Sequence, residues 1–292
     1  MTIREAQKIQ ESFYRKSNPS EDDVFVFTEA MSFLIAETND PQYMMQLGGY
    51  YYEDRQFDLA LKYYDLAAEY KYPPAYNCLG YVWYYGRTGT RDYEKAFRYF
   101  SLAEQTGDLI AAYKLADMYK NGYYVERDYE KYKQIIESLY PKIESARFLG
   151  DPLPEIFTRL ARIRTEEGEK DEAVDLYLRA KDFQAQRIGY NAFFGDLNIM
   201  MWLIDDLYEL IDFDEDDFDF YDMYYLLKKP CKISFMRENK VYEIVADELD
   251  GEFSIAFEGK YYRSREDFFK KACIDGERLT AVYDNLYCFE VE

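Results

Sequence analysis

Apolar residues in the first two thirds of the chain recur at the spacing of amphipathic helices. Leu79 and Trp83 lie four positions apart, so they share one face of a helix. A second apolar set follows at spacings i, i+3, i+4, i+7 and i+10, which is one face of a second helix. Its members are Tyr93, Ala96, Phe97, Phe100 and Ala103. The pattern predicts a pair of helices joined by a loop.

The same pattern returns along the chain, which is the signature of a repeat. The stretch LGYVWYYG (79–86) matches LADMYKNG (115–122) at an offset of 36 positions. The stretches RDYEKAFRYF and RDYEKYKQII, which follow them, match at the same offset. A similar unit begins at Leu47 with a loop four residues shorter, and another spans residues 160–180. We therefore expect consecutive helix pairs.

The small and capping residues of one unit have clear physical roles. Gly86 can end the first helix in the left-handed conformation, and Asp92 and Asp128 are good N-caps for the second helices. Gly80 and Ala96 allow the two helices of a pair to approach closely, while aromatic rings fill the wider gaps. Each pair leaves an apolar flank that only the next pair can cover, which predicts a solenoid.

The period, the Leu-Gly/Ala start and the A-x-x-x-F/Y second helix resemble the Sel-one-like repeats, close relatives of tetratricopeptide repeats. The resemblance covers residues 41–145, and residues 153–190 in a tetratricopeptide-like form. Loops of that family often read G-x-G-V-x-x-D. Here GRTGTRD and GYYVERD keep the first Gly and the Asp, but Thr88 or Tyr124 replaces the second Gly. The resemblance implies an adaptor or scaffold that binds other proteins and is not catalytic.

The resemblance also implies a binding face. In tetratricopeptide-like arrays the first helix of each pair lines the concave side, and residues two before, two after and five after the key Leu point outward. In this sequence the candidate partner-binding residues are Asn77, Tyr81, Tyr84, Tyr113, Asp117, Lys120 and, in the last unit, Arg162. The alternative is that Tyr81 and Tyr84 only pack against neighbouring units.

The last part of the chain has a different pattern. From about Leu226, the segments CKISFM, VYEIVADE, EFSIAFE and YCFEVE alternate apolar and polar residues, as strands do. DGE (250–252) and EGK (258–260) predict turns, and SREDFFKKACI (264–274) predicts a helix with Ser264 as its N-cap. This part is expected to be a small α+β domain.

Together these patterns predict a mainly α protein: a right-handed superhelical α-α repeat solenoid followed by a small α+β C-terminal domain. The expected organisation is an N-terminal helical cap (1–40), the solenoid with a C-terminal capping helix (41–212), an acidic connector (213–226) and the α+β domain (227–292).

Composition narrows the function classes. The formal net charge is −21, which disfavours direct binding to nucleic acid or to anionic membranes and favours a basic partner surface. The chain has no His, and its four Cys form no C-x-x-C pair, so we expect no metal site and no cofactor. The start lacks an apolar signal core and no apolar run could span a bilayer, which predicts a cytoplasmic protein.

An acidic strip precedes the predicted α+β domain. It consists of Asp212, Asp214, Glu215, Asp216, Asp217 and Asp219. Asp212, Asp214 and Asp216 have the starting spacing of a calcium-binding EF-hand loop, but Asp217 and Met223 replace its required Gly and Glu. A solvated connector and a strip that binds a basic partner, in imitation of a nucleic-acid strand, are the other two interpretations.

The preferred function is a non-catalytic scaffold or adaptor that binds a partner protein or peptide on the concave face of the repeats. The alternative is an acidic, nucleic-acid-mimicking inhibitor of a nucleic-acid-binding protein. A third interpretation makes the C-terminal domain the working part. The sequence has no catalytic motif, although its many carboxylates leave a two-carboxylate hydrolase open.

Overall fold

The structure is a computed structural model of the 292-residue chain, and it describes residues 1–16, 19–143, 152–191, 195–249 and 252–292. The chain divides into two compact units, Met1–Ile135 and Ile136–Glu292, each of which is described by itself. The fold is mainly α with a small strand-containing region near the C-terminus, as the sequence predicts. The predicted domain boundaries at residues 40, 212 and 226 stay predictions.

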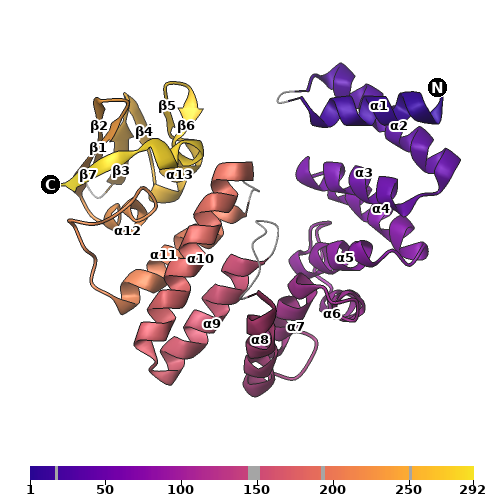
Figure 1. Ribbon diagram of the computed structural model, residues 1–292, viewed down its shortest axis with the longest axis horizontal. Coiled ribbons are helices and arrows are strands. Elements are labelled where there is room, and N and C mark those ends of the chain that lie inside the picture. The colour runs from indigo at the N-terminus through magenta and orange to yellow at the C-terminus, as the bar shows by residue number, and fades with distance from the viewer. Residues whose placement is uncertain (17–18, 144–151, 192–194, 250–251) are drawn as a thin grey trace. The chain divides into compact units, whose positions relative to one another are not determined.

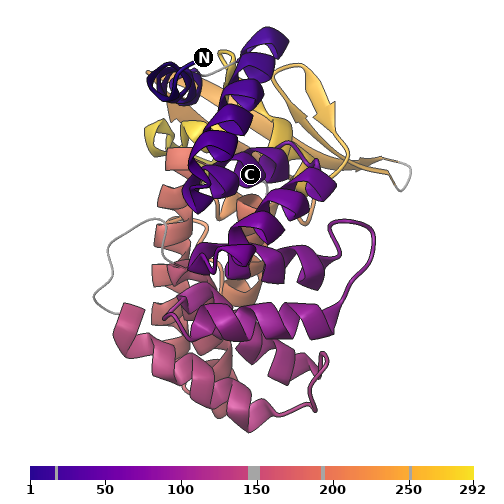
Figure 2. The ribbon, with the colours of Figure 1, turned by 90° about the vertical axis from the view of Figure 1, so that its right-hand side faces the viewer.

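The first unit is a series of helices that stack in chain order (Figures 1 and 2). Neighbouring helices pack as the pairs α1–α2, α3–α4 and α5–α6, and α7 follows on α6. The helices are α1 (Ile3–Tyr14), α2 (Glu21–Thr38), α3 (Pro41–Glu53), α4 (Phe57–Glu69), α5 (Pro73–Tyr85), α6 (Tyr93–Glu104), α7 (Leu109–Asn121) and the start of α8 (Tyr129–Ile143). Helices α1 and α2 form the part that the sequence predicts as an N-terminal cap.

The predicted helix ends are confirmed. Gly86 ends α5 with φ +63°, and Gly122 ends α7 with φ +70°, both in the left-handed region that favours glycine. The Asp92 carboxylate accepts the Lys95 amide at 3.0 Å at the start of α6. The Asp128 carboxylate does the same at 2.9 Å at the start of α8.

The loops of the two best-matched units also close in the same way. The amide of each N-cap Asp donates to a carbonyl of the preceding helix. The Asp92 amide donates to the Trp83 carbonyl at 3.1 Å, and the Asp128 amide donates to the Tyr119 carbonyl at 2.9 Å. The Lys95 ammonium lies 3.9 Å from the Trp83 ring centre, and the Lys131 ammonium lies 4.1 Å from that of Tyr119. Such cation–π contacts fasten the second helix of each pair to the end of the first.

The helices of a pair meet where a glycine faces a ring. A Cβ atom on Gly80 would lie 2.5 Å from the Phe100 ring, and one on Gly48 would lie 2.7 Å from the Tyr64 ring. These are the same positions in two successive units, so the close approach predicted for Gly80 is a repeated property of the array. Phe100 and Tyr64 are both buried, which places the core of each pair between its two helices.

The second unit holds the remaining elements. Helices α9 and α10 pack on one another, and α11 packs on α10. The helices are α9 (Leu153–Glu167), α10 (Lys170–Asn191), α11 (Asp196–Leu210), α12 (Met223–Leu226) and α13 (Arg265–Lys271). The strands are β1 (Cys231–Arg237), β2 (Lys240–Leu249), β3 (Glu252–Phe257), β4 (Lys260–Tyr262), β5 (Cys273–Ile274), β6 (Glu277–Arg278) and β7 (Tyr287–Val291), with two short 3-10 turns, η1 (Leu279–Ala281) and η2 (Tyr283–Asn285). Helix α11 lies at the end of the segment 41–212, where the sequence predicts a C-terminal capping helix, and its capping role stays a prediction.

Five of the strands form one antiparallel sheet in the order β4-β3-β2-β1-β7, and β5 pairs with β6. The four predicted strand segments are therefore confirmed. The predicted turn at 258–260 is also confirmed, with φ positive at both Glu258 and Gly259, as a type I′ hairpin requires. The predicted turn at 250–252 falls on residues that lie partly outside the described ones. Helix α13 covers the sheet, with the Phe268 ring edge-on to the Phe257 ring.

The sheet region is held firmly against α11 within the second unit. The Arg265 guanidinium donates to both Asp205 carboxylate oxygens, at 3.1 and 3.0 Å, and lies 3.8 Å from the Tyr224 ring centre. The Phe269 ring packs against the rings of Phe220 and Tyr224. The segment that joins the helices to the sheet is therefore a packed joint over residues 219–226.

The glycine–ring contact gives the first prediction. In Gly80→Ala the new methyl group must push the Phe100 ring away, so we expect the first unit to lose about 1–3 kcal/mol of its free energy of unfolding. The measurement is urea unfolding followed by Trp83 fluorescence in a Trp202→Phe background, because Trp83 and Trp202 are the chain's two tryptophans and lie one in each unit.

Gly49→Ala is the matched control, since a Cβ atom at Gly49 meets nothing within 4 Å. In the helix interior this change should leave stability unchanged or raise it by up to about 1 kcal/mol. Equal effects of the two substitutions would show that the ring contact does not limit the approach of the helices.

Candidate functional site

The predicted partner-binding residues lie on three helices. In the first unit α5 carries Asn77, Tyr81 and Tyr84, and α7 carries Tyr113, Asp117 and Lys120. Arg162 lies on α9 of the second unit.

The structure brings three of these residues into one cluster of rings. The Tyr81 and Tyr113 hydroxyls form a hydrogen bond of 2.8 Å between α5 and α7. The Tyr84 ring makes edge contacts with several other rings. These are the rings of Tyr85, Tyr93, Phe100 and Tyr123. Tyr113 is buried, whereas Tyr81 and Tyr84 are half-buried. Tyr81, Tyr84 and Tyr113 therefore contribute to packing, and their role in partner binding stays a prediction.

At the centre of the cluster is a lysine that the sequence analysis missed. Lys114 on α7 is only 5% exposed, and its ammonium donates to the Tyr85 hydroxyl at 2.7 Å. The ammonium also lies 5.0–5.2 Å from the centres of four tyrosine rings, those of Tyr81, Tyr84, Tyr85 and Tyr113. We call these four tyrosines and Lys114 the lysine cage. The repeat offset could have revealed it, because Lys114 immediately precedes the key Leu and so occupies a position on the packed side of the helix.

The other predicted residues of the first unit surround this cluster. Asp117 and Lys120 are half-buried on α7. The Lys120 ammonium lies 4.9 Å from the Tyr132 ring centre. The Asn77 side-chain oxygen is buried and has no hydrogen-bond donor among the described residues.

Arg162 has a partner within the second unit. Its guanidinium contacts the Asp206 carboxylate of α11 at 2.7 Å through Nε and at 2.6 Å through a terminal nitrogen. This ion pair ties α9 to α11. Arg162 therefore has a structural role that its position in the repeat did not predict.

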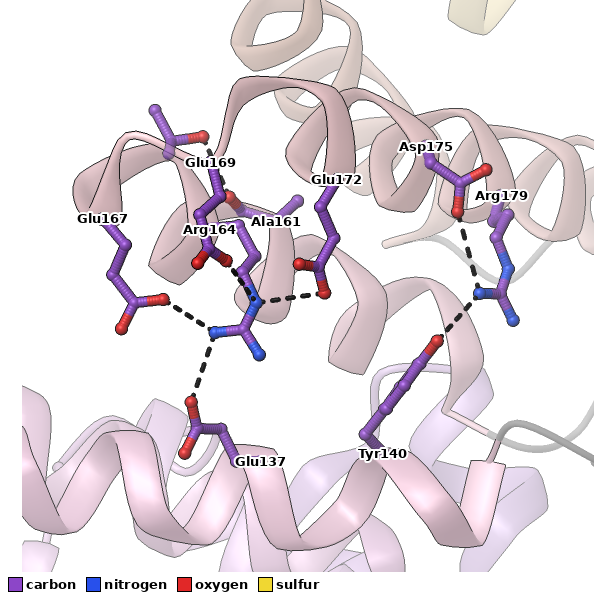
Figure 3. Close-up of polar contacts among 10 residues, drawn as sticks. Glu137, Tyr140, Ala161, Arg164, Glu167, Glu169, Glu172, Asp175 and Arg179 are labelled. Atoms are coloured by element: carbon purple, nitrogen blue, oxygen red, sulfur yellow. Dashed lines mark hydrogen bonds and ion pairs between the residues drawn. The ribbon is translucent and has the colours of Figure 1, made fainter.

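Arg164, on the same helix, is the centre of a larger network that the sequence analysis did not identify (Figure 3). Its guanidinium lies within 2.8–3.3 Å of four carboxylates, those of Glu137, Glu167, Glu169 and Glu172. The four acids come from α8, α9, the α9–α10 turn and α10. One cation thus holds these segments of the second unit together, which explains why the sequence tolerates the acidic run EEGEKDE there.

The acidic strip is anchored to the second unit by its rings. The Phe213 ring packs on those of Tyr208 and Tyr225, and the Phe218 ring packs on that of Phe289 in β7. The six acidic residues of the strip, at positions 212, 214–217 and 219, are exposed. The acidic strip is therefore held by the half-buried Phe213 and Phe218 rings, while its acidic residues are exposed.

The end of the acidic segment is closed by a second buried lysine. The Lys181 ammonium of α10, whose side chain is 13% exposed, lies 2.8 Å from the Asp219 carboxylate and 2.6 Å from that of Asp222. Burial raises the pKa of the Asp222 carboxyl, Asp219 raises it further, and Lys181 opposes both. Burial lowers the pKa of Lys181, but the two carboxylates outweigh this and raise it above its ordinary value.

Other chemistry is sparse in the part of the chain that the structure describes. Those residues include no group of three or more His, Cys, Asp or Glu side chains placed to hold a metal ion. Burial raises the pKa of the Cys78 thiol to about 12, so it is a weak nucleophile at neutral pH. No helix within the described ranges is long and apolar enough to cross a membrane.

No protein-family model matches the chain, and no curated protein matches it. Among solved structures, a Sel1 repeat protein from Oxalobacter formigenes is 18% identical with a TM-score of 0.45, over 71% of this chain and 84% of that one. The protein c5321, a protective antigen of uropathogenic Escherichia coli strains that displays an SLR fold, is 18% identical with a TM-score of 0.48, over 73% of this chain and 50% of that one.

Yeast Tom70 is 14% identical with a TM-score of 0.34, over 72% of this chain and 54% of its own. The chain thus spans about half the length of c5321 and of Tom70. The first two proteins belong to the repeat class that the sequence resembles. The repeat itself rests on the matching loops, caps and glycine–ring contacts within the chain.

The two buried lysines should respond differently to loss of their charge. Lys181→Met leaves the buried Asp222 carboxylate without its cation, so we expect the second unit to lose about 3 kcal/mol near neutral pH. Without Lys181 the pKa of Asp222 rises further, and the folded variant then binds a proton more readily than the unfolded one. The deficit should therefore shrink as the pH falls from about 8 to about 5.

Urea unfolding across this pH range, followed by Trp202 fluorescence in a Trp83→Phe background, measures the deficit. Lys170→Met, at an exposed position of the same helix, is the control and should have little effect. A deficit that does not change with pH would show that Asp222 does not take up the proton.

For Lys114 the expected result is the opposite. No carboxylate among the described residues pairs with its ammonium, so Lys114→Met removes the cost of burying a charge along with the ring contacts and one hydrogen bond. We expect the free energy of unfolding of the first unit to change by less than about 1 kcal/mol, because these effects oppose one another. A loss of stability as large as that of Lys181→Met would contradict this assignment.

Proposed function

We propose that the chain is a non-catalytic protein-interaction scaffold that binds a segment of a partner protein on the face formed by α5 and α7. The observation that supports this most is the ring cluster, which continues from one helix pair to the next through the Tyr81–Tyr113 hydrogen bond. A surface that spans two repeats can hold an extended peptide, whereas a single helix pair offers only one turn of contact.

The chemistry of this face suits protein recognition. Tyr84 is half-buried and Tyr85 is 37% exposed, so parts of both rings remain open to a partner while their packing keeps them in place. Rigid, half-buried tyrosines are frequent hot spots of protein interfaces, since little side-chain entropy is lost on binding. Asn77, Asp117 and Lys120 would add polar contacts at the edge of the rings. In the second unit, Arg162 would join a partner site only by releasing Asp206, so we leave it out of this proposal.

A second candidate function is supported by the anchored acidic strip. A mimic of nucleic acid needs carboxylates at fixed positions, and the half-buried Phe213 and Phe218 rings pack this strip against other rings of the second unit. In this function Asp212, Asp214, Glu215, Asp216, Asp217 and Asp219 bind a basic surface of a nucleic-acid-binding protein. Either function implies a protein partner, a cytoplasmic location and no cofactor, and these remain parts of the proposal.

One experiment separates the two. The tagged chain is used to capture partners from the source cell's lysate at low and at high salt, beside a face variant (Tyr84→Ala with Asp117→Ala) and a strip variant (Asp214→Asn, Asp216→Asn and Asp217→Asn). A partner of the ring face should remain at high salt, because packed contacts are screened little, and the face variant should bind it at least about 10-fold more weakly. A partner of the strip should dissociate at high salt, and it should bind the face variant as tightly as it binds wild type.

The control for the strip variant neutralises three exposed acids of the sheet region, Glu238, Glu248 and Glu258. Trp83 fluorescence shows whether the face variant still folds. A partner that all three variants retain equally at both salt concentrations would refute both functions.

A further inference from the structure

The five-stranded sheet has two faces of different character. Alternate residues of its strands, among them Phe235, Ile244 and Phe257, lie on the side that α13 covers and are buried. The residues between them make up the opposite side, which we call the open sheet face. The apolar residues of this face are all partly or largely exposed. They are Met236, Val241, Val245, Ala256, Tyr261 and Tyr287.

Apolar residues at these positions are not what a solvated face requires. An antiparallel sheet that meets water on one side ordinarily alternates apolar residues toward the core with polar residues toward water. Here the Val241 side of β2 is 59% exposed, and Tyr261 on β4 is 78% exposed. Exposed apolar residues that gather on one face indicate an interaction surface, whereas scattered ones do not.

The strand register arranges these residues in two rows. The first row crosses β7, β1 and β2, because Tyr287 and Val241 both pair with Met236. The second row crosses β2, β3 and β4, because Ala256 pairs with both Val245 and Tyr261. Strand β2 belongs to both rows, and the four positions from Val241 to Val245 separate them by about 13 Å.

A polar row with two acids lies between the apolar rows. Glu243 stands between Val241 and Val245 on β2 and pairs with Ser234 of β1. Ser234 in turn pairs with Glu290 of β7. A group that contacts both apolar rows must therefore pass over Glu243.

The open sheet face carries a net negative charge. Its acids also include Asp247 and Glu292, while the Lys232 ammonium lies 2.8 Å from the Glu243 carboxylate and 3.5 Å from that of Glu292. Asp247 and Glu290 have no ion-pair partner among the described residues. Four carboxylates thus surround one ammonium, so the face attracts a positively charged group.

The spacing of the rows matches one side of an α-helix. A helix laid along β2 presents its positions i, i+4 and i+8 at intervals of about 6 Å. Alternate residues of a strand lie about 6.7 Å apart, which is nearly the same interval. Apolar side chains at i and i+8 would contact the two rows, and a Lys or Arg at i+4 would reach Glu243. A second copy of the chain fits less well, because its own sheet would bring carboxylates against carboxylates.

We propose that the open sheet face docks an amphipathic helix of a partner protein, with a Lys or Arg between two apolar positions on its contacting side. The apolar rows supply most of the affinity, and Glu243 selects the basic residue. This surface is separate from the ring face of α5 and α7 and from the acidic strip. It gives the C-terminal domain a binding role of its own.

The test uses the full-length chain and a displayed library of helix-stabilised peptides in which one helical side is randomised. Wild-type protein should select peptides with apolar residues at i and i+8 and a Lys or Arg at i+4. The selected peptides should bind the variant Val241→Thr with Val245→Thr at least about 10-fold more weakly, because both apolar contacts are lost. Glu243→Gln should weaken binding about threefold at low salt and less at high salt, as for an exposed ion pair.

The matched controls are Val26→Thr, at an exposed valine of α2, and Glu248→Gln, at an exposed position on the other side of β2. Both should leave binding unchanged. A peptide of the same composition in scrambled order measures the non-specific attraction of a basic peptide to a chain of net charge −21.

The variants should fold, since Thr suits strands as Val does, and urea unfolding followed by Trp202 fluorescence checks this. Tyr261→Ser, at the most exposed member of the second row, is the second variant if the valine variant unfolds. It should also weaken binding of the selected peptides.

The possible results separate this inference from the proposed scaffold function. Peptides that bind the sheet variants as tightly as wild type, or no better than the scrambled peptide, would overturn the docking of a helix here. Peptides lost only in Tyr84→Ala with Asp117→Ala would bind the ring face, which supports the scaffold and overturns this inference. A dimer in sedimentation that the valine variant dissociates would identify a second copy as the occupant instead. Selection of no helical peptide would overturn this inference and leave binding of an extended segment by the ring face intact.

Discussion

The close approach of two helices at a glycine that faces a ring is the contact on which the repeat depends. Phe100 opposite Gly80 and Tyr64 opposite Gly48 leave no room for a Cβ atom, so ring size sets the distance between the helices of each pair. That distance in turn sets the width of the apolar surface that the next helix pair must cover. The first unit builds this joint twice, and 19% of the chain is aromatic, so rings are plentiful for such contacts.

The choice of tyrosine for many of these rings has a further consequence. A tyrosine buries as much apolar surface as a phenylalanine but brings a hydroxyl that must find a partner when buried. Between α5 and α7 the Tyr81 and Tyr113 hydroxyls satisfy each other, and the Tyr85 hydroxyl accepts from Lys114. Tyrosines used for packing thus bring hydroxyl groups between the helices. One of them, that of Tyr85, is the acceptor for the Lys114 ammonium in the lysine cage.

The sequence predicted the elements well because their signals are local. Gly86, Asp92 and Asp128 act through atoms a few positions away, and strand alternation needs only neighbouring residues. What it could not predict depends on contacts between distant segments. The place of Arg162 in the repeat predicted an outward-pointing side chain. Instead its guanidinium donates to Asp206, which lies 44 positions later in the sequence. The sequence did not show that the Phe213 and Phe218 rings beside the acidic strip pack on the rings of Tyr208 and Phe289. The repeat position of Lys114 could have shown that it is packed, but not that rings from two helices, α5 and α7, surround it.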